Sequence, residues 1–168
     1  VDMVLQYLRL DSETRDLDLQ RCQLDAVIRQ TVRKYAKLFI LKKIRLTFQE
    51  THLEVLSDEK WLAFLLEQVL SNALKYTPAG GRITVSVTLY ELFCRIDVAD
   101  TGPGLAEEEQ AKVFQRFYRS PAVQDQAGVG IGLAMAKSIL ARQNGKIFAE
   151  SPAEGGSRFT LRFYKTVV

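Results

Sequence analysis

Residues 58–81, DEKWLAFLLEQVLSNALKYTPAGG, form the stretch around which we expect the rest of the chain to fold. Apolar residues recur in it at steps of three and four, which predicts an amphipathic helix with one buried face. Asp58 or Ser57 can cap its start, and the pair Thr77 and Pro78, with the glycines after it, ends it. The predicted buried face consists of Leu62, Leu65, Leu66, Val69, Leu70, Ala73 and Leu74.

The same helix carries a polar stripe, formed by Gln68, Asn72, Lys75 and Tyr76. At this spacing their side chains point the same way. The stripe can be an ordinary solvated face or a ligand site. An amide oxygen such as that of Asn72 suits Mg²⁺. The Lys75 ammonium suits phosphate, and the Tyr76 ring offers a face to a base.

Composition narrows the class of protein. The chain has 168 residues, 47% apolar and 26% charged, as expected of one globular domain. Its net charge of +3 is too small to indicate a nucleic-acid partner. Cys22 and Cys94 lack metal-ligand spacing, so we interpret both as packing residues. No apolar run reaches the length of a membrane span and no signal peptide is recognised, so we expect a cytosolic domain.

Segments before the central helix alternate between helix and strand. Residues 1–16 start in helical register and look like the end of a longer helix. Residues 17–23 form a linker or short edge strand, and residues 24–41 a second helix. Its predicted buried residues are Ile28, Thr31, Val32, Tyr35 and either Leu38 or Phe39. Two short strands are predicted to follow, at residues 43–49 and 52–56.

Segments after the central helix continue this alternation. Residues 83–89 and 93–99 have period two and predict a hairpin. A short helix and a polar segment follow within residues 105–129, then a helix at 130–144 and a final pair of strands at 145–163. This order predicts an α+β two-layer sandwich with a mixed, mostly antiparallel sheet, covered by helices on one face.

Two glycine-rich loops are candidate binding elements. In Asp100-Thr101-Gly102-Pro103-Gly104, a carboxylate at a strand end can accept a hydrogen bond from an exocyclic amine, and the glycines allow close approach. A simple tight turn is the alternative. Gly128, Gly130 and Gly132 precede a helix, where free backbone amides bind anions. They follow a polar segment rather than a strand, so they match the dinucleotide fingerprint poorly, and a hinge is the alternative.

Together these segments resemble the ATP-binding catalytic domain of bacterial sensor histidine kinases, in the superfamily shared with gyrase, heat-shock chaperone ATPases and MutL. The resemblance implies a Bergerat-type fold for residues 24–163. The segments that carry it are 67–76, which resembles the N box, 100–104 and 128–133, which resemble the two glycine boxes, 114–119, which resembles the F box, and 156–161, which resembles the closing strand.

The resemblance also implies roles for individual residues. Asn72 would coordinate Mg²⁺, Lys75 would meet phosphate, and Gln68 joins these two in the candidate catalytic set. Residues 118–129 would form a lid over the phosphates of ATP, to which Arg116 or Arg119 would add charge. Between Arg119 and Gly128 this lid has no basic residue of its own. The residues implied to bind nucleotide are Asn72, Lys75, Tyr76, Asp100, Gly102, Gly104, Phe117, Arg119, Gly128, Gly130, Gly132 and Leu133.

By the same resemblance the chain would transfer the γ-phosphate of ATP to a histidine on a dimerisation domain, from which a response regulator aspartate would receive it. Residues 1–16 would be the end of that domain, 17–23 a linker and 24–168 the catalytic domain. The full-length protein would be a membrane-anchored homodimer with this part in the cytoplasm. The entry segment and central helix look most like short-sensor kinases that respond to envelope stress and peptide antibiotics.

Two other functions remain open. ATPases of the gyrase and chaperone type carry a glutamate four residues before the metal-binding asparagine, whereas this chain has Gln68, which cannot act as a general base. Glu67 points about 100° away around the helix. The same difference disfavours serine-kinase anti-sigma factors. A module that only binds nucleotide or a partner is the second alternative. The only histidine, His52, reads as a strand residue rather than a phosphate acceptor.

Overall fold

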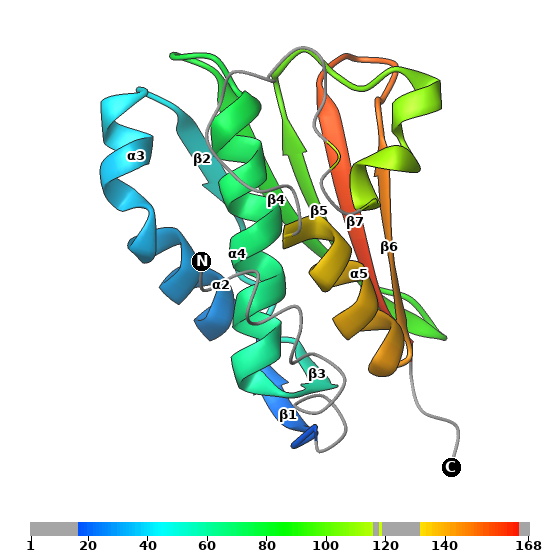
Figure 1. Ribbon diagram of the computed structural model, residues 1–168. Coiled ribbons are helices and arrows are strands. Elements are labelled where there is room, and N and C mark those ends of the chain that lie inside the picture. The colour runs from blue at the N-terminus through cyan, green and yellow to red at the C-terminus, as the bar shows by residue number, and fades with distance from the viewer. Residues whose placement is uncertain (1–16, 116–117, 119–131, 165–168) are drawn as a thin grey trace.

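The computed structural model describes residues 17–115, 118 and 132–164, and in it the chain forms two layers (Figure 1). One layer is a five-stranded sheet, and the other consists of helices that cover one face of it. The helices are α2 (Leu24–Lys34), α3 (Ala36–Leu41), α4 (Glu59–Tyr76) and α5 (Gly132–Arg142). The predicted two-layer α+β sandwich is confirmed.

The main sheet has the order β2-β4-β5-β7-β6. Only β2 and β4 run parallel; the other neighbours are antiparallel, which confirms the predicted mixed sheet. Its strands are β2 (Arg45–Phe48), β4 (Arg82–Leu89), β5 (Phe93–Asp100), β6 (Gly145–Glu150) and β7 (Ser157–Tyr164). A separate antiparallel pair joins β1 (Gln20–Gln23) to β3 (Glu54–Ser57), so of the two alternatives for residues 17–23, linker or short strand, the strand is found at residues 20–23.

The central helix α4 forms as predicted. The Asp58 carboxylate accepts hydrogen bonds from the backbone N–H groups of Lys60 and Trp61, which otherwise have no partner in the first turn. The predicted apolar face is buried, with every residue at most 4% exposed. It packs against β5 and lies between α2 and α5. This helix therefore holds the two layers together.

The predicted helix over residues 24–41 is two helices, with the break at Tyr35. Tyr35 has φ −105° and ψ 13°, outside the helical region, and its N–H bonds to the Val32 carbonyl three residues back. The tighter turn re-orients the residues that follow. Phe39 rather than Leu38 consequently enters the core, and Leu38 is exposed.

The predicted strand at residues 52–56 begins later, at Glu54, because the Asp25 side chain hydrogen-bonds to the backbone that precedes it. The buried Asp25 carboxylate accepts from the N–H groups of Thr51 and His52, at 3.1 and 2.8 Å. His52 takes up a left-handed conformation, with φ 58°. Its side chain is 84% exposed and precedes the strand instead of starting it.

Residues 105–115 contain two short 3₁₀ turns, η2 (Glu107–Glu109) and η3 (Lys112–Phe114), where one short helix is predicted. The predicted helix of residues 1–16 lies outside the described residues. Within the described part of the chain, none of the helices is both long and apolar enough to cross a membrane.

Candidate nucleotide-binding site

The end of α4 and the loop after β5 meet in the structure. A Cβ placed on Gly102 would lie 2.9 Å from the Tyr76 carbonyl oxygen and 2.9 Å from Asp100 Oδ1. Only glycine can pass so close to the last turn of the helix. The last turn of α4, where the polar stripe ends, and the Asp100 loop thus lie next to each other, although they are far apart in sequence.

Asp100 continues the buried face of β5 and is only 5% exposed. Its Oδ1 accepts hydrogen bonds from the N–H groups of Gly102 (2.8 Å) and Ser157 (3.3 Å). Burial raises the pKa of this carboxyl above its ordinary value, while the two hydrogen bonds act in the opposite direction. Because both bonds end on Oδ1, the second oxygen, Oδ2, can accept from the amine of a ligand.

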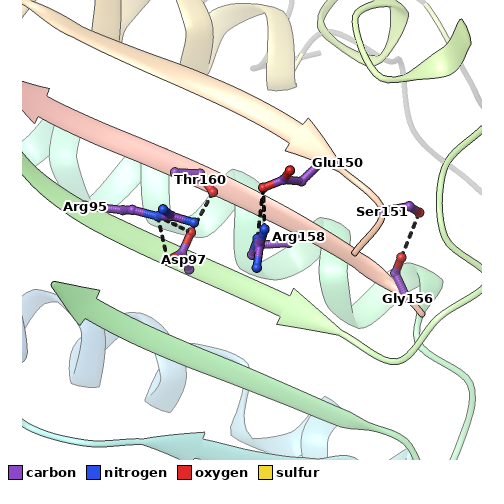
Figure 2. Close-up of polar contacts among 7 residues, drawn as sticks. All are labelled: Arg95, Asp97, Glu150, Ser151, Gly156, Arg158 and Thr160. Carbon is purple, nitrogen blue, oxygen red and sulfur yellow. Dashed lines mark hydrogen bonds and ion pairs between the residues drawn. The ribbon is translucent and has the colours of Figure 1, made fainter. Parts of the chain in front are cut away.

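The turn between β6 and β7 clamps the Asp100 loop. Ser151 Oγ accepts from the N–H of Leu105 at 2.7 Å and donates to the Gly156 carbonyl at 2.8 Å; Figure 2 shows the latter bond. Gly104 has φ 85°, and a Cβ there would lie 2.7 Å from Ser151 Oγ. The predicted glycine is thus required both by conformation and by space. The role of Ser151 was not predicted from the sequence. The nearby Gly155-Gly156 pair indicates a turn before the last strand, but it does not indicate which loop this turn contacts.

The C-terminal end of α4 is stabilised by a residue that the sequence did not reveal. Lys42 Nζ donates to the Leu74 carbonyl, one of the last in the helix, at 2.5 Å. A cation at this end also interacts favourably with the helix dipole. Thr77 Oγ1 donates to the Ala73 carbonyl at 2.6 Å and is fully buried. The helix therefore ends in a fixed position beside the Asp100 loop.

The polar stripe is partly accessible. Gln68, Asn72 and Tyr76 are half-buried and Lys75 is exposed. Glu67, adjacent to the stripe, forms an ion pair with Lys34 of α2 at 2.8 Å. Glu67 thus faces α2, in agreement with the predicted difference in direction between Glu67 and the stripe.

Tyr118 is a further residue near the stripe that sequence reasoning did not single out. Its hydroxyl donates to Glu109 Oε2 at 3.2 Å. Burial raises the pKa of Tyr118, and the charge of Glu109 and the proximity of Tyr76 raise it further. The Tyr118 side chain is therefore held at the η2 turn by Glu109.

Several predicted site residues lie outside the described residues, namely Phe117, Arg119, Gly128 and Gly130, together with Arg116 and most of the predicted lid. Gly132 is the first residue of α5, and Leu133 packs against the core. Helix α5 lies next to α4 (Figure 1). Phe114 of the F box is buried, with its ring edge-on to Phe159 at 6.1 Å between centroids.

The donors at this site fit an adenine nucleotide with magnesium. A buried carboxylate stands beside glycines at which a Cβ would collide with the backbone, which suits a flat, amine-bearing ring. Asn72 offers one hard oxygen, so phosphate oxygens and water would have to complete the shell of a magnesium ion. Another group of candidate metal ligands in the described residues, Asp25, Glu50 and His52, lies before β3. There the Asp25 oxygens bond to the backbone and Glu50 pairs with Arg29.

This fold and site define a nucleotide-binding catalytic domain, and comparison with known proteins identifies its family. The chain belongs to the family of histidine kinase-, DNA gyrase B- and HSP90-like ATPases, whose family model matches residues 57–167. The predicted family and its ATP-binding character are thereby confirmed.

Curated relatives are sensor kinases. The sensor histidine kinase RppB of Synechocystis sp. is 34% identical over 163 residues, covering 95% of this chain and 36% of RppB. The sensor protein kinase PmrB of Pseudomonas aeruginosa is 32% identical over 155 residues, covering 92% of this chain and 32% of PmrB. The chain thus spans about a third of the length of these relatives.

Solved structures share the fold. The mycobacterial sensor histidine kinase MprB superposes with a TM-score of 0.76 at 25% identity, over 87% of this chain and 97% of that one. Histidine kinase ThkA, solved in complex with the response regulator protein TrrA, superposes with a TM-score of 0.82 at 24% identity, over 98% of this chain and 47% of that one.

Proposed function

We propose that this chain is the part of a two-component sensor kinase that binds ATP and transfers its γ-phosphate to a histidine on a separate dimerisation domain. A response regulator aspartate then receives the phosphate. The relatives named as sensor kinases and the neighbour solved with its response regulator support this assignment. We further propose that residues 1–16 end the dimerisation domain, that 17–23 link it to the catalytic domain at 24–168, and that the whole protein is a membrane-anchored homodimer of the short-sensor type.

Asp100 carries adenine recognition in this proposal. Its Oδ2 accepts from the exocyclic amine, while Gly102 and Gly104 let the backbone approach the ring. Tyr76 lies at the same place, where the loop packs on α4. Lys75 attracts the phosphates, and Asn72 would hold a magnesium ion, which supplies charge neutralisation at the phosphates when bound.

The observation that favours a kinase over an ATPase is the residue at position 68, Gln68. A general base there would activate water, but the amide of Gln68 cannot accept a proton in this way. The neighbouring carboxylate, Glu67, is paired with Lys34 at 2.8 Å. Water is consequently a poor acceptor at this site, and transfer to a positioned imidazole is favoured because positioning supplies most of the catalysis.

The acceptor lies outside this chain. His52 is the only histidine, and its backbone is held by Asp25 before β3. The strand β3 leads into the first residue of α4, whereas Asp100 lies at the other end of that helix, which is 18 residues or roughly 27 Å long. His52 is thus too far from the nucleotide to receive its phosphate within one molecule.

The test is to incubate the chain with radiolabelled ATP and Mg²⁺, with and without a separate helical domain that carries an acceptor histidine. We expect acid-labile label on the added domain only, lost with Asn72→Ala and transferable to a receiver domain. Label on His52, or transfer that survives Asn72→Ala, would contradict the proposal.

A further inference from the structure

A hollow lies along β6, away from the nucleotide elements. This groove has a volume of about 680 Å³ and lies between the η2–η3 segment, α5 and β6. Figure 1 shows β6 at the margin of the sheet, with α5 beside it. Because α5 contacts α4 on one side and β6 on the other, it separates the groove from the stripe of Gln68, Asn72 and Lys75.

The backbone of β6 is available for pairing on its outer side. β6 is the last strand of the sheet, and within the described residues it pairs only with β7. The outward N–H and C=O groups of such an edge strand are a template for a further strand. An extended peptide can bind a sheet in this way, with the main chain supplying the hydrogen bonds and the side chains the specificity.

The charge at the start of β6 is positive. The charged residues that line the groove are Lys137 and Lys146, whereas Glu150 at the end of β6 pairs with Arg158 at 2.7 Å. Lys146 stands directly opposite Arg162 of β7, which stands opposite Arg95 of β5, so three cations form one row across the open face of the sheet. Like charges directly opposite one another are destabilising. An anionic side chain next to Lys146 would relieve this repulsion.

Only part of the row is compensated within the described residues. Arg95 pairs with Asp97 at 2.9 Å, and Figure 2 shows how these two side chains lie. The Arg162 guanidinium lies 4.8 and 4.9 Å from the rings of Phe93 and Phe148, and its buried Nε has no hydrogen-bond partner in the described part of the chain. Lys146 is exposed at the margin. The surplus positive charge therefore lies at the edge where a strand would add.

The other side of the edge is apolar. Phe114, Ala141 and Ile147 line the groove, and Lys137 Nζ lies 5.7 Å from the Phe114 ring centroid. Side chains alternate along a strand. On an added strand, the residue opposite Ile147 would thus point into the groove, and the residue opposite Lys146 would lie on the open face.

We propose that this groove binds an extended segment of another protein, added to β6 as a further strand, in which acidic residues alternate with apolar ones. An acidic residue lies beside Lys146, and an apolar residue enters the groove against Phe114. This site is independent of the nucleotide site. If this proposal fails, the proposed kinase function still stands, because Lys146 has no part in that function.

The probe is an acetylated, amidated peptide of alternating glutamate and valine, of the same six-residue length as β6. It is titrated into isotopically labelled chain and followed by NMR and amide hydrogen exchange. We expect the amide signals of residues 145–150 to shift and their exchange to slow. Two control peptides should lose binding: one with lysine in place of glutamate, and one N-methylated at every backbone amide, which cannot donate to an edge strand from either side.

The matched variants are Lys146→Glu and Lys37→Glu, the second an exposed lysine on α3. Lys146→Glu should weaken peptide binding by about tenfold, and Lys37→Glu should not. Both should bind ATP like the unmodified chain. The proposal is overturned if the acidic peptide does not bind, which would make Lys146 only a guard against edge pairing. Equal binding of either control peptide overturns it too, as do shifts of the same amides with chain concentration alone, which would indicate self-pairing.

Discussion

Gly156 lies directly against Asp100: a Cβ on Gly156 would fall 1.8 Å from the Asp100 carbonyl oxygen. Next to this contact, the N–H of Ser157 donates to the Asp100 carboxylate. The start of β7 thus holds both the backbone and the side chain of Asp100, the residue that we propose recognises adenine. The position of this carboxylate depends on a glycine 56 residues further along the chain.

Gly156→Ala should therefore destabilise the fold and weaken ATP binding together. The new methyl group would collide with the Asp100 backbone, which cannot move aside. In addition, Gly156 has a φ of 73°, a backbone conformation that alanine rarely adopts. We expect the free energy of unfolding to fall by about 2 kcal/mol or more in denaturant titrations. Gly155→Ala is the control, because Gly155 also has a positive φ, 102°, but open space around it. It should cost about 1 kcal/mol. Equal losses in the two variants would show that the contact with Asp100 does not matter.

Asp100 should make the domain prefer ATP to GTP. Its carboxylate accepts from the amine of adenine, whereas guanine presents an oxygen at the same place. Asp100→Ala should cost about 1–3 kcal/mol of ATP binding measured by calorimetry, the usual penalty for losing a charged hydrogen-bond partner. Asp97→Asn, on the opposite face of the same strand and bonded to Arg95 and Thr160, should leave nucleotide affinity unchanged. Equal affinities of the unmodified chain for ATP and GTP would refute this assignment.

The elements that could be predicted from sequence are those with a local signal. The three- and four-residue steps of α4 and the alternation of β4 and β5 both correspond to observed elements. The Asp100 loop could be recognised because its aspartate and glycines lie within five residues. Its packing against Tyr76 was not visible in the sequence, since it depends on how the sheet and the helix meet.

What sequence reasoning missed acts over long separations. Ser151 reaches Leu105 across 46 residues, and Lys42 reaches the Leu74 carbonyl across 32. A serine or a lysine in isolation carries no signal for such contacts. The break at Tyr35 has the same character, because the local pattern continues through it. Tertiary packing, which brings Phe39 into the core, overrides that pattern.

Asp25 should make the fold sensitive to acid. Burial alone would raise its pKa, but the hydrogen bonds from the His52 and Thr51 N–H groups outweigh burial and lower the pKa below its ordinary value of 3.8. The unfolded chain thus binds more protons in this range, so stability is present above 3.8 and is lost as pH falls through the lowered pKa. Asp100, with its raised pKa, contributes with the opposite sign.

Asp25→Asn isolates this contribution. We expect it to cost about 1–3 kcal/mol at neutral pH and to flatten the acid limb of the stability curve, measured by urea titration at a series of pH values. Glu54→Gln, which removes an exposed carboxylate on β3, should retain the acid limb. If Asp25→Asn loses stability at low pH in the same way as the unmodified chain, then carboxylates other than Asp25 cause the sensitivity to acid.

The last prediction concerns the fate of the γ-phosphate. With ATP and Mg²⁺ alone the chain should release phosphate slowly, because Gln68 cannot activate water. It should also not label itself, because His52 precedes β3, which leads into the first turn of α4, whereas the Asp100 loop lies at the last turn of that helix. Gln68→Glu places a carboxylate four residues before Asn72, on the same stripe. We expect it to raise phosphate release by about 100-fold, the low end of what a positioned base supplies. Gln68→Ala should stay at the basal rate, which separates a gained base from a lost amide. Adding Asn72→Ala to Gln68→Glu should abolish the gain if it depends on correctly bound nucleotide. Rapid release by the unmodified chain, or no gain in Gln68→Glu despite unchanged ATP affinity, would mean that position 68 does not decide between water and histidine as acceptor.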